Sequence, residues 1–326
     1  MNKLTTFFLI LSTGLSACGM DNPDLSKEYK DLAERWEWQV GSEQLGRLGR
    51  LREKFKKEKN LSELHPVIES AAKKAFKVCN ITEPILTLQD NHSTSSACYR
   101  LTDEDYYPVK GMAIGAEDNR GSNPLPYIRA TIFHECGHIK AGDVEASAFT
   151  KDLPFVLGVI TASTYAGKHA SKLLQRLPKP ARIFGGVTTG IATWFGLSKS
   201  YQRTIYAYQT RKIERNADIF AIRKLIDLHD HYAIAYRFLD NTYNVDEGNT
   251  NWKNEYWLFH DHPGYLERAK IILDELKHAN VDLNNLPLNS KLYDDVEGEP
   301  AVWESNEVQK RFTAQIKKHF PEYLEK

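Results

Sequence analysis

The chain has 326 residues, and its 43 basic and 43 acidic side chains cancel to a formal net charge of zero. That balance excludes a bulk electrostatic attraction to nucleic acid as the basis of its function. The charged fraction of 26% and the aromatic fraction of 11% are those of a folded protein, and the length allows one large domain or two modest ones.

The first residues are typical of an export signal. Lys3 gives a short positive start, and the apolar stretch from Leu4 to Gly14 is too short to be a spanning helix. The following Leu15-Ser16-Ala17-Cys18 resembles a bacterial lipobox, in which the signal is cut before a Cys that is then lipid-modified. We therefore expect removal of residues 1–17 and a lipid anchor on Cys18, facing the periplasm, with Gly19 favouring the outer membrane. A plain cleaved signal is the alternative.

Residues 18–78 are predicted to form an N-terminal helical region. The segment from Leu25 to about Lys59 is charged with scattered apolar residues, which indicates a helix with a break at Gly41. The segment from Leu61 to Val78 indicates a second helix, with Ser62 as its cap.

The hydrophobic period changes after this region. Ile85–Leu88 and Met112–Ile114 are short strand candidates bounded by turn residues, so we expect a small sheet. Cys79 and Cys98 enclose a loop of ordinary disulfide length around a polar segment. In an oxidising compartment we expect these two cysteines to be paired.

A helix that starts near Pro126 carries the motif His134-Glu135-Cys136-Gly137-His138. The four-residue spacing puts both imidazoles on one helix face, about one turn apart. Catalytic zinc takes three protein ligands and leaves one position for water, and Glu135 on the adjacent face could accept that water's proton. Cys136 is expected to be a small buried residue. Two ordinary helical histidines are the alternative, and a third ligand decides between these interpretations.

Two uncharged stretches of fifteen residues follow, 153–167 and 183–197. Neither reaches the roughly 20 residues that span a hydrocarbon core, and their glycines and threonines suit close helix packing. The sequence therefore predicts a hairpin, residues 153–197, that either touches or dips into a bilayer or is buried in the protein. Basic residues connect the two stretches: Lys168, Lys172, Arg176, Lys179 and Arg182.

The third ligand is expected on a long helix predicted from Tyr201 to Asp227. Glu214 and Asp218 are four residues apart, so they share a face beside the small Ala217. A zinc-bound His usually donates its second ring N–H to a carboxylate. We therefore expect Glu214 to be the third zinc ligand and Asp218 to accept the hydrogen bond from a ligand histidine. Exposed salt bridges to neighbouring basic residues are the alternative.

Three motifs in order resemble those of a known family. They are the His-Glu-x-x-His motif, the segment Glu214-Arg215-Asn216-Ala217-Asp218, and His262-Pro263 followed by Arg268. Over about residues 80–275 the chain is similar to the M48 zinc peptidases, the group of Ste24-like, HtpX-like and Oma1-like proteases. The resemblance implies a gluzincin fold with zinc on His134, His138 and Glu214 and with Glu135 as base. Asn216 stands where the family often has Glu, at a position that is not a ligand.

The resemblance also implies roles for residues around the metal. Asp218 would support a ligand His, and His262, with His260 as its rival, would lie near the oxyanion, where a positioned donor is worth about 2.7–4 kcal/mol. We expect Arg268 to hold its loop to the core by bonding a carboxylate. Met112–Ile114 is where the family's edge strand would bind an extended peptide by backbone pairing.

Together these features predict a mostly helical α+β zinc metalloendopeptidase with a small sheet beside the motif helix. The peptidase domain would span residues 79–280 with the hairpin inserted, and residues 281–326 would form a C-terminal helical tail. Zn²⁺ is the expected cofactor, misfolded or membrane proteins of the envelope are the expected substrates, and no nucleic-acid partner is expected. The alternatives are a client-binding, chaperone-like lipoprotein with a structural or inactive zinc centre and a narrow-substrate maturation protease.

Overall fold

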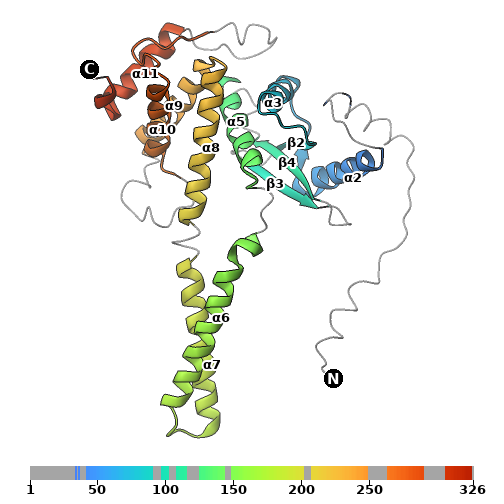
Figure 1. Cartoon of the computed structure of the whole chain (residues 1–326), viewed down its shortest axis with the longest axis vertical. Helices are drawn as coiled ribbons and strands as arrows, with labels where there is room; N and C mark the ends of the chain where they lie inside the picture. Colours follow the sequence, from blue (N-terminus) through green and yellow to red (C-terminus); the bar gives the residue numbers. More distant parts are fainter. Residues whose placement is uncertain are drawn as a thin grey trace. The chain divides into compact units, whose positions relative to one another are not determined.

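The structure is a computed structural model that describes residues 34, 36, 42–90, 97–102, 108–115, 125–143, 148–201, 207–248, 263–289 and 305–324. The chain divides into two compact units, Met1–Arg50 and Leu51–Lys326. The described residues form nine α-helices and one small mixed sheet (Figure 1). The prediction of a mostly helical α+β protein is therefore confirmed.

The description of the first unit covers mainly the beginning of helix α2 (Ser42–Lys59). This helix starts directly after Gly41, where the sequence predicted a break. Leu45, Leu48 and Leu51 recur every three residues along it and are buried. That spacing is typical of an amphipathic helix with one apolar side.

The second unit begins differently from the prediction made from the sequence. Leu61 and Ser62, predicted to start a helix, form the short strand β1 (Leu61–Ser62), and helix α3 (Pro66–Val78) starts four residues later. Proline explains the late start, because it restricts the residue before it to extended conformations and is well suited to the first helical position. Ser62 therefore does not cap this helix.

The sheet has the strand order β1-β2-β4-β3. Strand β2 (Ile85–Asp90) pairs in parallel with β4 (Pro108–Gly115), and β3 (Ala97–Thr102) pairs with β4 in the antiparallel sense. The sequence predicted β2 and β4 but not β3. The expectation that Met112–Ile114 lies on an edge strand is wrong, because these residues belong to β4, which has a neighbour on each side. Among the strands that the structure describes, the edge on this side of the sheet is β3.

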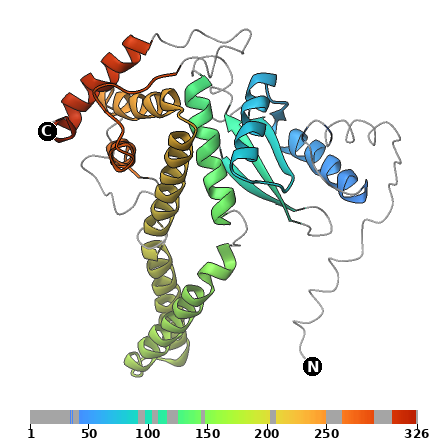
Figure 2. The same ribbon diagram turned by 45° about the horizontal axis from the view of Figure 1, so that its top comes forward.

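Helix α5 (Leu125–Ala141), which carries the His-Glu-x-x-His motif, is the central element of the second unit. It is buried over most of its length. It packs against β3, β4 and α3, and also against α8 (Ala207–Asp227) and α9 (His231–Asp246) (Figure 2). Helix α10 (Tyr265–His278) packs on α8 and α9, and α11 (Ser305–His319) packs on α9 and is followed by the 3₁₀ turn η4 (Pro321–Tyr323).

The two apolar stretches form the predicted helical hairpin. Helix α6 (Ala148–Leu173) and helix α7 (Lys179–Tyr201) lie side by side and pack on each other (Figure 1). Among the described residues, no helix combines the length and the apolar character needed to cross a membrane. The helix predicted from Tyr201 begins, within the described residues, at Ala207 as α8.

Candidate metal centre

The two histidines of α5 face each other across one helical turn. The Nε2 atoms of His134 and His138 lie 3.2 Å apart. His134 is only 6% exposed, because the residues before it, including Ile132 and Phe133, are part of the core. The burial of α5 therefore holds both imidazoles in place on the side that faces α8.

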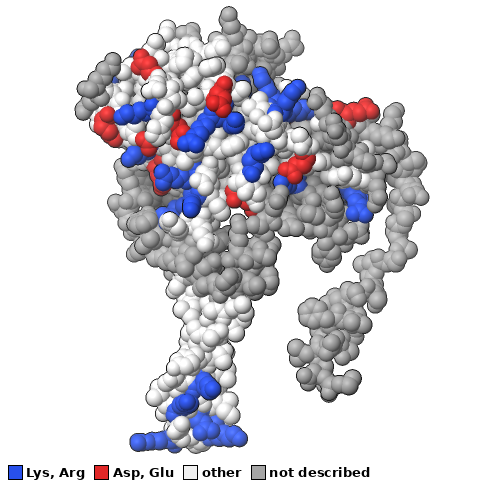
Figure 3. All heavy atoms as spheres, viewed as in Figure 1, with Lys and Arg blue, Asp and Glu red and all other residues white. Residues whose placement is uncertain are grey.

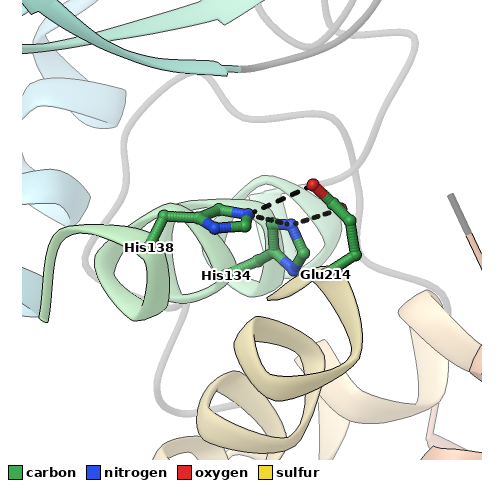
Figure 4. A group of neighbouring side chains, drawn as sticks. All are labelled: His134, His138 and Glu214. Atoms are coloured by element: carbon green, nitrogen blue, oxygen red, sulfur yellow. Dashed lines mark hydrogen bonds and ion pairs between the residues drawn. The ribbon is translucent and has the colours of Figure 1, made fainter. Parts of the chain in front are cut away.

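Helix α8 brings Glu214 to the histidines because it approaches α5 unusually closely. A Cβ atom on Gly137 would lie 3.0 Å from the Cα atom of Ala217 and 3.2 Å from its carbonyl oxygen. Only glycine leaves room for this contact without a shift of one helix. As a result Glu214 Oε2 lies 3.4 Å from Nε2 of His134, and Oε1 lies 3.5 Å from Nε2 of His138 (Figure 4).

These spacings fit a single metal ion. Tetrahedral ligands at about 2.0–2.1 Å from zinc lie about 3.3–3.4 Å from one another. The two Nε2 atoms lie 3.2 Å apart, and each lies 3.4 or 3.5 Å from a different oxygen of Glu214. Counted with one ligand atom per residue, the three groups lie within 4.8 Å of one another. His134, His138 and Glu214 are also the one group among the described residues whose His, Cys, Asp or Glu atoms converge closely enough to hold a metal ion.

Asp218 and Arg268 support the first histidine. Nδ1 of His134 lies 2.9 Å from Oδ1 of Asp218, one helical turn after Glu214. Arg268 of α10 donates two hydrogen bonds to the Asp218 carboxylate, from Nε at 2.7 Å and from Nη2 at 2.6 Å. A proton on Nδ1 that is shared with a carboxylate leaves the Nε2 lone pair for a metal. Arg268 thus bonds a carboxylate, as expected, and this carboxylate is the Asp218 side chain next to His134.

The second histidine has a carboxylate of its own, which was not predicted from the sequence. Nδ1 of His138 lies 3.3 Å from Oδ2 of Asp143. Asp143 reaches this position because the chain turns at Gly142, whose φ is 71°, and the Asp143 N–H donates to the carbonyl oxygen of His138. A signal was present in the sequence: glycine commonly ends a helix in the left-handed conformation and turns the next residue back.

The site is electrostatically negative. Burial alone would lower the pKa of His134, but the charge of Asp218 and the hydrogen bonds to Asp218 and Glu214 outweigh burial and raise it to about 9. Burial likewise opposes the ionisation of Asp218, yet the positive charges of Arg268 and His134 hold its pKa far below the ordinary value. Ionised carboxylates that stabilise a positive imidazole also favour a bound cation in the same place.

Glu135 lies on α5 beside the sheet. It is only 4% exposed, and its carbonyl oxygen is 3.5 Å from the thiol sulfur of Cys98 on β3. Burial, followed by the negative charge of Glu135, raises the pKa of Cys98. Among the described residues, Glu135 is not one of the three groups that converge.

The predicted disulfide between Cys79 and Cys98 is not present, and the three described cysteines are free. Interaction with Cys136 instead lowers the pKa of the Cys79 thiol, because α3 packs on α5. Cys136 is fully buried, as expected for a small core residue, and burial raises its pKa. The spacing along the chain thus predicted Cys98 as the partner of Cys79, whereas the packing of the helices places Cys136 beside it.

Three of the candidate residues, Cys18, His260 and His262, lie outside the described residues. A comparison with protein-family models finds no match to this chain, and no curated protein is significantly similar to it. The fold and the site therefore define a mostly helical protein with a His134, His138 and Glu214 group that could hold a metal ion.

Proposed function

We propose that the chain is a zinc-dependent endopeptidase of the gluzincin type, related to the M48 peptidases. The observation that supports this most strongly is the group of two imidazoles and one carboxylate whose ligand atoms lie within 4.8 Å of one another, with a second carboxylate near each histidine Nδ1. Three protein ligands are typical of catalytic zinc, whereas structural zinc usually has four and is often bound by cysteines.

The roles of the side chains follow from peptide hydrolysis. Zn²⁺ in this site would supply a Lewis acid that polarises a peptide carbonyl and makes water acidic enough to be activated near neutral pH. Glu135, buried next to His134, is proposed to accept the proton of the attacking water and to deliver it to the leaving amine. His262 is proposed to donate a hydrogen bond to the carbonyl oxygen as negative charge develops on it.

Strand β3 is the proposed binding edge for the substrate. It is the last strand of the sheet on this side, it packs against α5, and Cys98 connects it to Glu135. An extended peptide could add to its outer edge by backbone hydrogen bonds, which tolerate many side chains. Such tolerance suits unfolded or misfolded proteins of the cell envelope as substrates, and the lipobox-like Cys18 would keep the enzyme there.

The test combines metal content with cleavage of an unfolded protein by the full-length chain. We expect Glu135→Gln to keep its zinc and to lose about 10²–10⁴-fold in rate, because only the proton acceptor is removed. Glu214→Gln should lose zinc, whereas Glu247→Gln, an exposed acid at the end of α9, should keep both zinc and activity.

Two outcomes would redirect the proposal. If the wild-type chain binds zinc but cleaves no unfolded protein, the client-binding and narrow-substrate alternatives move ahead of general proteolysis. If Glu135→Gln cleaves as fast as the wild type, the assigned base is wrong. Loss of zinc from the Glu247→Gln control would show that the metal measurement reports stability rather than ligand chemistry.

A further inference from the structure

The α6–α7 hairpin exposes far more apolar surface than the rest of the second unit. Leu173 is 81% exposed and Phe184 is 74% exposed. Of the large hydrophobic residues described as exposed, all but Tyr208 belong to the hairpin or its turn. Folded monomers rarely expose contiguous apolar patches above a few hundred Å², and larger ones mark a binding surface for protein or membrane.

Of the seven large apolar residues that α7 exposes, all but Leu197 form a patch on one side of that helix, which we call the α7 face. They recur at positions i, i+1, i+4, i+8, i+11 and i+12, a pattern that follows the helical repeat. Each of them is more than a third exposed. The α7 face consists of Ile183, Phe184, Val187, Ile191, Trp194 and Phe195.

The two helices of the hairpin approach closely at small residues, where backbone meets backbone. A Cβ atom on Gly167 would lie 2.7 Å from the carbonyl oxygen of Gly186, and one on Gly190 would lie 3.2 Å from that of Ser163. Small residues at a helix–helix contact are characteristic of helices that meet in lipid. Because small residues make these closest contacts, every side chain of the α7 face stays more than a third exposed.

The hydroxyl groups of the hairpin need little water. Six exposed Ser and Thr side chains each donate to the carbonyl oxygen four residues earlier in their own helix, at 2.5–2.8 Å. Such bonds satisfy a hydroxyl inside the helix and so lower the cost of moving it out of water. The six residues are Thr161, Thr164, Thr188, Thr189, Thr193 and Ser200.

Beyond Asp152, near the start of α6, the charge of the hairpin has one sign. The sequence from 153 to 213 contains no Asp or Glu. Five basic side chains gather where α6 turns into α7 (Figure 3), and we call this group the basic turn. The basic turn consists of Lys168, Lys172, Arg176, Lys179 and Arg182, of which all but Arg182 are exposed.

We propose that the hairpin docks on an anionic lipid bilayer, with the α7 face in the boundary between headgroups and acyl chains and the basic turn among anionic headgroups. A one-sided apolar face with basic residues beside it is the pattern of a helix that lies in the interface plane. Charge complementarity selects anionic lipid, since a protein partner for this surface would have to bring all the acidic groups itself. The inference rests on the hairpin alone and stands whether or not the chain cleaves peptides.

The test uses the fluorescence of Trp194 in the full-length chain with Cys18→Ser, so that no acyl anchor carries the protein to the vesicles. Vesicles contain phosphatidylcholine with brominated acyl chains, with or without phosphatidylglycerol. We expect vesicles with phosphatidylglycerol to quench part of the tryptophan fluorescence. The Trp194→Phe variant should lack that quenched part of the emission. Because Trp194 belongs to the α7 face, its quenching reports contact between that face and the acyl chains.

Charge variants test the headgroup contact. Each basic residue near an anionic surface contributes roughly a fivefold factor in partitioning, so Lys172→Gln, Arg176→Gln and Lys179→Gln together should weaken vesicle binding on the order of a hundredfold. The matched control removes three exposed lysines of α10 and α11 and should bind within about twofold of its parent. Its changes are Lys270→Gln, Lys310→Gln and Lys317→Gln.

Three results would overturn the proposal. The first is binding to vesicles without quenching of Trp194, and the second is equal loss of binding in the basic-turn variant and its control. The third is self-association of the protein without lipid, if the double variant Phe184→Ser and Phe195→Ser abolishes it and vesicles leave Trp194 unquenched. The α7 face would then be an interface between protein molecules. Circular dichroism of each variant establishes that it is folded before binding is compared.

Discussion

Replacing Gly137 with alanine tests whether the close approach of α5 and α8 sets the geometry of the metal centre. The new Cβ would lie 3.0 Å from Cα and 3.2 Å from the carbonyl oxygen of Ala217. Carbon contacts are favourable at about 3.5–4.0 Å, so the helices must separate by roughly 0.5–1 Å. Glu214 would move with α8, and its distances of 3.4 and 3.5 Å to the two Nε2 atoms would grow accordingly.

We expect Gly137→Ala to lower the affinity for zinc more than the free energy of unfolding. Overpacking costs about 1–3 kcal/mol, and alanine returns up to about 1 kcal/mol of helix propensity, so the stability of the metal-free protein should drop by about 0–2 kcal/mol. Zinc affinity should fall at least about tenfold, since even the loss of a residue behind a ligand costs 10–100-fold. Chelator competition measures the affinity, and urea unfolding measures the stability.

Gly158→Ala is the matched control, because nothing lies within 4 Å of the Cβ position at this glycine of α6. It should leave zinc affinity unchanged. If Gly137→Ala is folded and binds zinc as tightly as the wild type, the contact between the helices does not control the ligand spacing, and the role assigned to Gly137 is refuted.

Three further outcomes are expected. Asp143→Ala should lower zinc affinity about 10–100-fold by removing the partner of His138 Nδ1, and an unchanged chelator midpoint would contradict that role. Arg268→Ala leaves the buried Asp218 with His134 as its remaining positive partner and should destabilise the metal-free protein by up to about 3–5 kcal/mol in urea. A loss comparable to that of a surface substitution would count against this role. Burial opposes ionisation of Asp246, but hydrogen bonds from Lys318, Gln315 and His319 of α11 lower its pKa. The stabilisation that Asp246 provides is therefore present above its ordinary pKa of about 4 and is lost as the pH falls through the lowered pKa. Asp246→Asn should therefore cost no more than about 1 kcal/mol at neutral pH, and a difference in urea midpoint that persists at low pH would argue against this sign.

Helical spacing made the core of the candidate site predictable. His134 and His138 share a face by their separation alone, and Glu214 could be named because Asp218 one turn later offered the carboxylate that a ligand histidine needs. Asp143 was beyond such reasoning, because its place depends on the turn at Gly142 after the helix has ended.

The errors in the fold have physical causes as well. The run from Met112 to Ile114 is buried throughout, as suits a strand with neighbours on both sides, so its unbroken apolar character indicated the interior rather than an edge. The thiol partner of Cys79 depends on how α3 packs on α5, which spacing along the chain does not determine. The late start of α3 was readable from Pro66.

The hairpin separates the two halves of the metal centre along the chain, since α6 and α7 lie between His138 and Glu214. The halves are held together by the packing of α5 on α8, not by the covalent connection. A chain cut by a protease in the turn between α6 and α7 should therefore remain one particle with its ligands in place. By the same reasoning, two fragments expressed separately and divided at this turn could reassemble a metal site that neither fragment contains alone.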